Sequence, residues 1–410
     1  MNIMVRANAY SIGVQWVHHI EREAPLEALN LMSCYEDMPD PRVEYLCLHK
    51  LIDIVMIVIC ATIAGSDNWQ EIAGFGEDRE KWLRGFLELP HGIPSHDTFE
   101  RVFAMMNADE FERRFRLWMA TVFKISKGQV IALDGKCLRR AHDKNSGEGL
   151  RYVVSAWATQ SRLIIGQTKV DDKSNEITAI PELLELLDIS GCIITIDAIG
   201  CQCKIAQQII EQEGDYVLAV KENQPNLHAR IEGVLGAADQ DKMPPEAEYA
   251  STTDKDHGRV EIRHCWVIQD KDSLRYVQKG KTRWPKLRSL IKVQSERIVR
   301  GQVSGDCRYY ISSLQRSPQE LLTAIRSHWG IENSLHWCLD VAFREDESRY
   351  RTDYGPGNLA TVRHISINLL RQDKHPRGVS GPDVFTLPEA FLILRKPLAC
   401  ESMRAPCAAR

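Results

Sequence analysis

The pattern of apolar residues changes after Lys127 and Gly128, and this change most constrains the fold. Before it, apolar residues recur at helical spacing, whereas after it they form short runs typical of strands. The expected elements are a strand at 129–134, hairpin strands at 151–159 and 163–170, a helix at 176–187, a strand at 192–197, a helix at 203–213 and a strand at 215–220. This order predicts an α/β domain with a ribonuclease-H-like mixed sheet and helices packed on it.

The chain as a whole is expected to contain four regions. They are a leader at 1–30, a helical N-terminal domain at 31–125, the α/β domain at 126–375 and a loosely structured tail at 376–410. Within the helical region, Ile54 to Ala64 is strongly apolar but too short to span a bilayer, so we expect a buried helix.

An insertion at about 222–314 interrupts the α/β order. The alternating apolar residues of Arg259 to Ile268 favour a strand, and the insertion is therefore expected to be β-rich. Lys271 to Arg300 holds ten lysines or arginines against two acids. Such a stretch is as compatible with a solvated face as with a surface that contacts phosphates. A formal net charge of −4 predicts that any nucleic-acid contact depends on local patches.

Composition places the chain among ordinary globular proteins, with 44% hydrophobic and 26% charged residues. Cys201 and Cys203 form the only close pair among twelve cysteines, and no second pair completes a zinc pattern. Free thiols in a reducing compartment are the expected state. The N-terminus lacks the features of a signal peptide, so we expect a cytoplasmic protein.

A helix is predicted from Ser317 to Phe343, downstream of the insertion. Ser317 and Glu320 form a capping box with Pro318 at the first helical position. Apolar residues then recur at three- and four-residue intervals, and Glu332 falls on the face that they define. A carboxylate in an apolar stripe reaches solvent, finds a buried partner, or is held where a cation needs it.

Three carboxylates have coherent positions in the expected fold: Asp134, Asp197 and Glu332. Each aspartate ends an apolar strand, and the two strands are expected to be neighbours, with the helix carrying Glu332 packed beside them. Either aspartate alone is more often a turn residue or a helix cap, and Glu332 alone could pair with Arg326 or Lys136. Together they would repel one another unless a divalent cation such as Mg²⁺ or Mn²⁺ bound them, so we expect a metal site.

Ordered motifs also resemble a known family. They are IPSHDTFERVF at 93–103, IALDGK at 131–136, TIDAIGCQ at 195–202, VLAVKENQ at 217–224, DHGRVE at 256–261 and HWGIENSLHWCLDVAFREDESR at 328–349. They are similar to the H-repeat-associated transposases, bacterial insertion-sequence enzymes of the DDE class, over roughly residues 40 to 370. The resemblance implies a ribonuclease-H-like core with Asp134, Asp197 and Glu332 as its metal-binding triad. It also implies metal-dependent cleavage of double-stranded DNA at element ends and strand transfer into a target. A dimer would hold two ends.

The chain departs from the wider class at three positions. Related insertion-sequence transposases carry Tyr, Arg and Lys around the catalytic Glu, where this chain has Ile325, His328 and Leu339. The tail from Gly378 also differs from the usual ending of the family.

Other residues have two interpretations each. Lys136, Lys221, His257, Arg259 and Arg326 are candidate DNA contacts, although strand-end charges or a turn at His257 would account for some of them equally well. The remaining candidates, His336, Trp329 and Trp337, are expected to be packed side chains. The alternative for His336 is a group that supports the metal ligands, and the alternative for the two tryptophans is base stacking.

Two other functions remain compatible with the sequence. One is a structure-selective nuclease of the same fold that cuts without joining. The other is a catalytically inactive copy that binds element ends.

Overall fold

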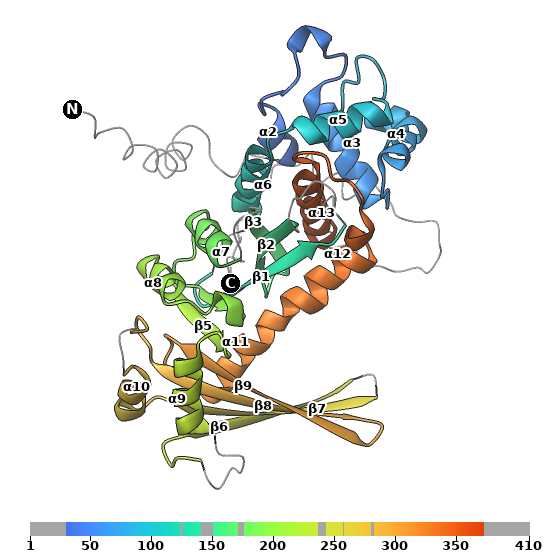
Figure 1. Ribbon diagram of the computed structural model, residues 1–410. Helices are drawn as coiled ribbons and strands as arrows, with labels where there is room; N and C mark the ends of the chain where they lie inside the picture. The colour runs from blue at the N-terminus through green and yellow to red at the C-terminus, as the bar shows by residue number, and fades with distance from the viewer. Residues whose placement is uncertain are drawn as a thin grey trace, which may run out of the picture. The chain divides into compact units, whose positions relative to one another are not determined.

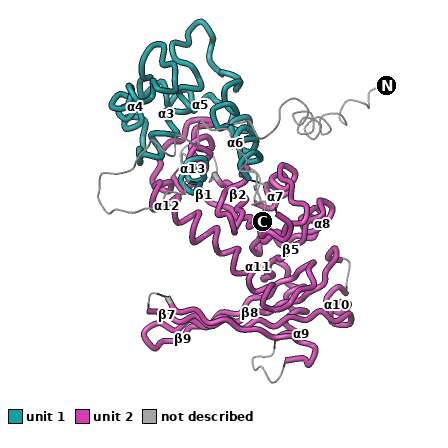
Figure 2. The backbone as a smooth tube through the Cα atoms, turned by 180° about the vertical axis from the view of Figure 1, so that it is seen from behind, with its two compact units in different colours: residues 1–124, 365–410 teal, residues 125–364 magenta. Residues whose placement is uncertain are grey.

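The structure is a computed structural model that describes residues 30–123, 126–140, 151–170, 176–236, 243–256, 258–279 and 283–372 (Figure 1). The chain divides into two compact units, residues 1–124 with 365–410 and residues 125–364 (Figure 2). The expected tail, and all of the expected leader except its last residue, lie outside the described residues.

The described N-terminal part of the first unit is helical. Its elements are α2 (Leu31–Tyr35), η2 (Glu44–Leu46), α3 (Leu51–Ile63), α4 (Trp69–Leu83), α5 (His96–Met105) and α6 (Ala108–Val122). Side chains of Asn30, Asn68, Ser95 and Asn107 accept backbone N–H bonds and cap α2, α4, α5 and α6. All of α3 except Ile52 is buried, which confirms the expected core helix. No helix in the described ranges is long and apolar enough to cross a membrane.

A nine-stranded mixed sheet forms the centre of the second unit. Its strands are β1 (Val130–Leu138), β2 (Arg151–Ala158), β3 (Leu163–Val170), β4 (Ile193–Ile196), β5 (Asp215–Val220), β6 (Glu248–Asp256), β7 (Arg259–Ile268), β8 (Ser289–Val299) and β9 (Gln302–Ser312). Their order is β3-β2-β1-β4-β5-β9-β8-β7-β6. β1, β4 and β5 are parallel, and β2 and β3 form the antiparallel hairpin expected from the sequence. The predicted ribonuclease-H-like mixed sheet is confirmed.

The insertion extends this sheet. β9 pairs with β5 on one side and with β8 on the other, both antiparallel, so β6 to β9 continue the hydrogen-bonded ladder of the central strands. Two helices in this region were not expected, α9 (Pro225–Leu235) and α10 (Lys271–Val277). The basic stretch that begins at Lys271 therefore starts on a helix and continues into β8.

The remaining elements are helices. They are α7 (Glu176–Glu185), η3 (Ala198–Gly200), α8 (Cys203–Glu211), α11 (Pro318–Gly330), the π-helix η5 (Ile331–His336), α12 (Trp337–Val341), η6 (Glu345–Glu347) and α13 (Gly355–Gln372). α11 starts at the predicted capping box of Ser317 and Glu320, in which both reciprocal bonds are formed. α11, η5 and α12 follow one another directly, so one helical rod runs from the sheet extension past the central strands (Figure 1).

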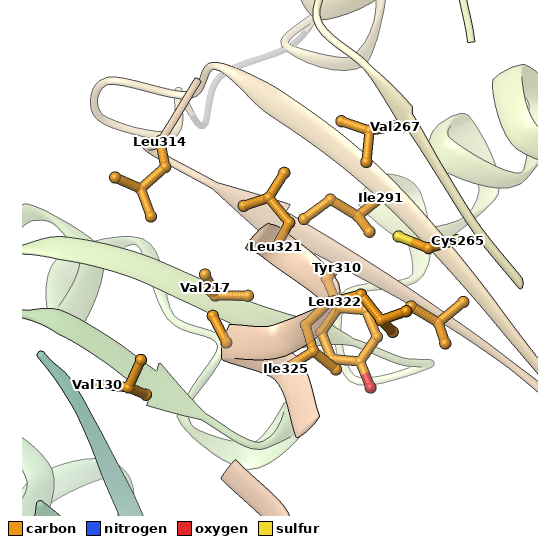
Figure 3. Close-up of a cluster of buried hydrophobic side chains, with 12 residues drawn as sticks. Val130, Val217, Cys265, Val267, Ile291, Tyr310, Leu314, Leu321, Leu322 and Ile325 are labelled. Carbon is orange, nitrogen blue, oxygen red and sulfur yellow. The ribbon is translucent and has the colours of Figure 1, made fainter. Parts of the chain in front are cut away.

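An apolar cluster fixes α11 to the sheet. In Figure 3, Leu321, Leu322 and Ile325 of α11 lie among side chains from the central strands and from the insertion. The strand residues include Val217 of β5 and Tyr310 of β9. Because this one cluster joins the insertion, the helix and the parallel strands, its burial stabilises all three together.

Truncation of this cluster should destabilise the protein. Leu322 is fully buried, so Leu322→Ala removes contacts and leaves a cavity, and we expect the free energy of unfolding to fall by about 2–5 kcal/mol. Leu186→Ala, at a 46% exposed leucine, is the matched control and should cost less than about 1 kcal/mol. Urea unfolding monitored by far-UV circular dichroism measures both variants. An equal effect of the two changes would contradict the role of the cluster.

Candidate active site

The parallel pairing of β1 and β4 brings two aspartates to the same edge of the sheet. Leu133 of β1 pairs with Ile196 of β4; Asp134 is the next residue of β1, and Asp197 directly follows β4. The predicted juxtaposition is therefore confirmed. The prediction that the first strand ends at Asp134 was wrong, because β1 continues to Leu138 and Asp134 pairs with Ser155 of β2.

Each aspartate also makes a local bond of the kind that turn residues make. Oδ1 of Asp197 accepts the N–H of Ile199 at 2.9 Å and caps η3, and Oδ1 of Asp134 accepts the N–H of Gly135 at 2.9 Å. These bonds orient the carboxyl groups and occupy one oxygen atom, Oδ1, of each. The capping role and a metal-ligand role are therefore compatible for both residues.

The π-helix places Glu332. A strict helical period would put Glu332 in the buried stripe, but the wider turn of η5 buries Ile331 and Leu335 and leaves Glu332 exposed. Single π turns inside α-helices are rare and are frequent at functional sites. The sequence prediction that Glu332 occupies an apolar face was wrong for this reason, although the prediction that it approaches the aspartates is supported by the electrostatics below.

The carboxylates interact electrostatically. Burial, followed by the negative charges of Asp197 and Glu332, raises the pKa of Asp134 to about 7. Glu176, the first residue of α7, contributes to this shift, and its own pKa is raised by burial and by Asp197. All the charged groups that produce the shift of Asp134 are acidic. Among the described residues, the charges that act on Asp134 are therefore negative.

Glu176 is an acid that the sequence did not single out. A Cβ on Gly135 would collide with its carboxylate, so the glycine after Asp134 leaves room for this fourth acid. The only sequence signal was an acid in the first turn of an expected helix, which is an ordinary helix-start feature.

Two half-buried histidines contact this region from the helical side. Nδ1 of His336 lies 3.6 Å from Oδ2 of Asp134, and Nδ1 of His328 lies 3.0 Å from Oγ1 of Thr195, two residues before Asp197. Burial lowers the pKa of both rings to about 4. Since His336 is neutral at pH 7, its contact with Asp134 is not an ion pair and does not balance the charge of the acids.

The positions that depart from the wider class have packing roles. Ile325 and Leu339 are 4% and 1% exposed and belong to the interior, and His328 contacts Thr195. Trp329 is half-buried with the Arg308 guanidinium 4.4 Å from its ring centre. Trp337 is 60% exposed, so the prediction that it is a core residue was wrong.

The candidate DNA contacts occupy different surroundings. Lys221 is exposed and lines a cavity of about 130 Å³ together with Asp197 and Glu332. Arg326 pairs with Asp254 at 2.7 Å and Arg259 with Glu261 at 3.4 Å, and both arginines line a hollow of about 830 Å³ between α11 and the insertion strands. Lys136 pairs with Asp340 at 2.7 Å. His257 lies outside the described residues.

The donor chemistry of the site suits a hard divalent cation. Asp134, Asp197 and Glu332 offer carboxylate oxygens, the ligands that Mg²⁺ and Mn²⁺ prefer, and a cation would favour the ionised form of Asp134. In the part of the chain that the structure describes, no group of three or more His, Cys, Asp or Glu side chains is already arranged to hold a metal ion. A metal would thus have to draw the acids closer together.

Comparison with known proteins gives consistent matches. Residues 125–369 match the family model described as "Transposase DDE domain", and residues 32–119 match the model described as "DDE_Tnp_1-associated". The "H repeat-associated putative transposase YhhI" of Escherichia coli (strain K12) is 40% identical over 359 residues, 85% of this chain and 92% of that protein. The "Uncharacterized protein in dhlA 3'region" of Xanthobacter autotrophicus is 45% identical over 288 residues, 69% of this chain and 94% of that protein.

The raised pKa of Asp134 predicts a pH-dependent stability. A carboxyl whose pKa is higher in the folded than in the unfolded protein stabilises the fold below about pH 4, and this contribution is lost as the pH rises through 7. At about 1.4 kcal/mol per pKa unit, the loss amounts to at most about 4 kcal/mol. Asp134→Asn should remove this loss, so that its free energy of unfolding in EDTA changes less between pH 5 and pH 8 than that of the wild type.

Urea unfolding at both pH values measures the difference. Asp188→Asn, at an exposed acid, is the control and should keep the wild-type pH dependence. Mn²⁺ should restore stability at pH 8 to the wild type more than to Asp134→Asn, because binding to the folded state stabilises it. Identical pH profiles for the wild type and Asp134→Asn would show that the acids do not interact as described.

Proposed function

Because the chain belongs to the DDE transposase family, we propose that it cleaves DNA at the ends of an insertion-sequence-type element and joins the freed 3′-hydroxyl to target DNA. The observation that carries the proposal is the adjacency of Asp134 and Asp197 on parallel strands, with Glu332 close enough to raise the pKa of Asp134. A cluster of acids that raise one another's pKa values fits a reaction that brings its own cations.

Asp134, Asp197 and Glu332 would hold Mg²⁺ or Mn²⁺. When bound, the divalent cations supply positive charge that stabilises the attacking and leaving oxygens of the phosphodiester. The chain itself supplies rigid placement: two ligands lie on paired strands, and the third lies on a helix fixed to the sheet by its apolar residues. The neutral ring of His336 limits the positions open to the Asp134 carboxyl group without competing for its charge.

Binding of the DNA backbone is assigned to cations around the acids. Lys221 is exposed at the cavity that Asp197 and Glu332 share, where it would contact a phosphate next to the scissile bond. Arg259 and Arg326 line the larger hollow beside the insertion, together with Arg297 and Arg308, and would contact phosphates farther along the duplex. His257 is proposed with this group from its place in the DHGRVE motif. Two copies of the chain would hold the two element ends.

Loss of one acid should abolish cleavage while the fold survives. With Mn²⁺ and a duplex that carries the element end, Asp134→Asn or Glu332→Gln should lower the cleavage rate by roughly 10²–10³-fold or more, the effect of losing one electrostatic stabiliser. Glu185→Gln, at an exposed glutamate at the end of α7, is the control and should cleave at the wild-type rate. Gel separation of end-labelled strands measures the rates.

The same assay separates the proposal from its alternatives. A precut end should be joined to a second duplex by the wild type, whereas a nuclease of this fold would give no joined product. Binding of the end without cleavage in Mn²⁺ or Mg²⁺ would indicate an inactive end-binding copy. Wild-type cleavage by a folded Glu332→Gln variant would refute the assignment of the triad.

A further inference from the structure

Lys136 lies beside the acids but is bound to a different set of carboxylates. It follows Asp134 by two residues on β1, so both side chains lie on the same face of the strand. Its Nζ is 2.7 Å from Oδ1 of Asp340, 3.1 Å from Oδ1 of Asp346 and 3.6 Å from Oε2 of Glu345. The Lys136 side chain is only 10% exposed, which leaves little of it open to a DNA phosphate.

The carboxylate partners come from the segment that follows Glu332. Asp340 is on α12, directly after the π-helix, and Glu345 and Asp346 are in η6. Arg344 has φ 46°, a left-handed conformation that turns the chain between these two elements. A non-glycine residue adopts such a backbone at a cost, which the contacts of Glu345 and Asp346 with Lys136 help to offset.

Glu345 connects the group to one more helix. Its side chain is 2% exposed, and Oε1 lies 3.4 Å from the guanidinium of Arg363 on α13. A buried carboxylate between two cations resists rearrangement, because loss of either partner leaves a buried charge unpaired. We refer to Lys136, Asp340, Glu345, Asp346 and Arg363 as the Lys136 clamp.

We propose that Lys136 is a positioning residue, which holds β1 to the segment after Glu332 through the Lys136 clamp so that Asp134 and Glu332 meet at one metal site, and which does not contact DNA phosphate. The proposal rests on the proposed function. Asp134 and Glu332 lie almost two hundred residues apart in the sequence, and the clamp joins the strand of one to the helix of the other. The clamp also pairs Lys136 with three other acids, which keeps the charge of Asp134 available to a metal ion.

Lys136→Met separates positioning from phosphate contact by two measurements on the full-length protein. The first is the Mn²⁺ concentration that gives half-maximal thermal stabilisation, and the second is the affinity for a short DNA duplex of arbitrary sequence in EDTA at several salt concentrations. We expect the Mn²⁺ requirement to rise about tenfold or more, while the DNA affinity and its salt dependence stay as in the wild type. If Lys136 contacts phosphate instead, the DNA affinity falls, the salt slope decreases by about one and the Mn²⁺ requirement is unchanged.

Other variants complete the test. Lys286→Met breaks the 3.0 Å ion pair of Lys286 with Asp215, the first residue of β5, and should leave the Mn²⁺ requirement as in the wild type. Lys136→Arg keeps the cation and should restore most of the Mn²⁺ affinity that Lys136→Met loses. If Lys136→Met does not fold, Asp346→Asn provides the test: the clamp predicts weaker Mn²⁺ binding, whereas a phosphate-contacting Lys136, freed of one acid, predicts tighter DNA binding.

The proposed function and the role of the Lys136 clamp can be rejected independently of each other. Mn²⁺ binding by the wild type without any DNA cleavage rejects the proposed function and leaves the clamp to be decided by the Lys136 variants. An equal Mn²⁺ requirement for the wild type and a folded Lys136→Met rejects the clamp and leaves the function unaffected.

Discussion

The parallel pairing of β1 with β4 is the constraint on which the candidate site depends. In a parallel pair the two strands run in the same direction, so the residues that follow the last paired positions are brought together by backbone hydrogen bonds. Asp134 and Asp197 occupy those positions. Their proximity costs electrostatic free energy, and the burial of the apolar residues before them, such as Leu133 and Ile194, supplies the stability that permits it.

The third acid requires longer-range organisation. Glu332 follows a helix that begins shortly after β9, and the apolar face of α11 is buried by strands from both the insertion and the core. The insertion therefore has a structural effect on the site whether or not it binds DNA. Because β9 pairs with β5, the strand next to β4, a change in the insertion can be transmitted to the acids through one continuous sheet.

The fold and the acids could be predicted from sequence where the signal was local. Short apolar runs followed by acids specify strands whose register puts the acids at an edge, and the capping box at Ser317 specifies where α11 begins. Features that depend on distant partners could not be predicted. Gly135 and Lys136 resemble a turn in sequence, yet β1 continues through them because β2 pairs with them.

The π-helix could not be predicted either, because the apolar spacing after Ser317 fits a constant α-helical period. That change of period explains one wrong prediction, the position of Glu332 on the buried face of the helix. Likewise, the carboxylates that bind Lys136 lie more than two hundred residues after it, and no sequence pattern joins them.

The charges near the site are divided into two groups with opposite consequences. Around Lys136 and Arg363, cations and carboxylates are paired, with Glu345 and Arg363 buried, and such pairing favours one arrangement of the elements. Around Asp134, the charged groups that shift its pKa are all acidic and the neighbouring histidine is neutral. If Lys136 turned toward Asp134, it would lower the repulsion among the acids and would also lower their affinity for an external cation. The three carboxylates that bind Lys136 prevent this, so the ion pairs that stabilise the fold also maintain the negative charge of the site.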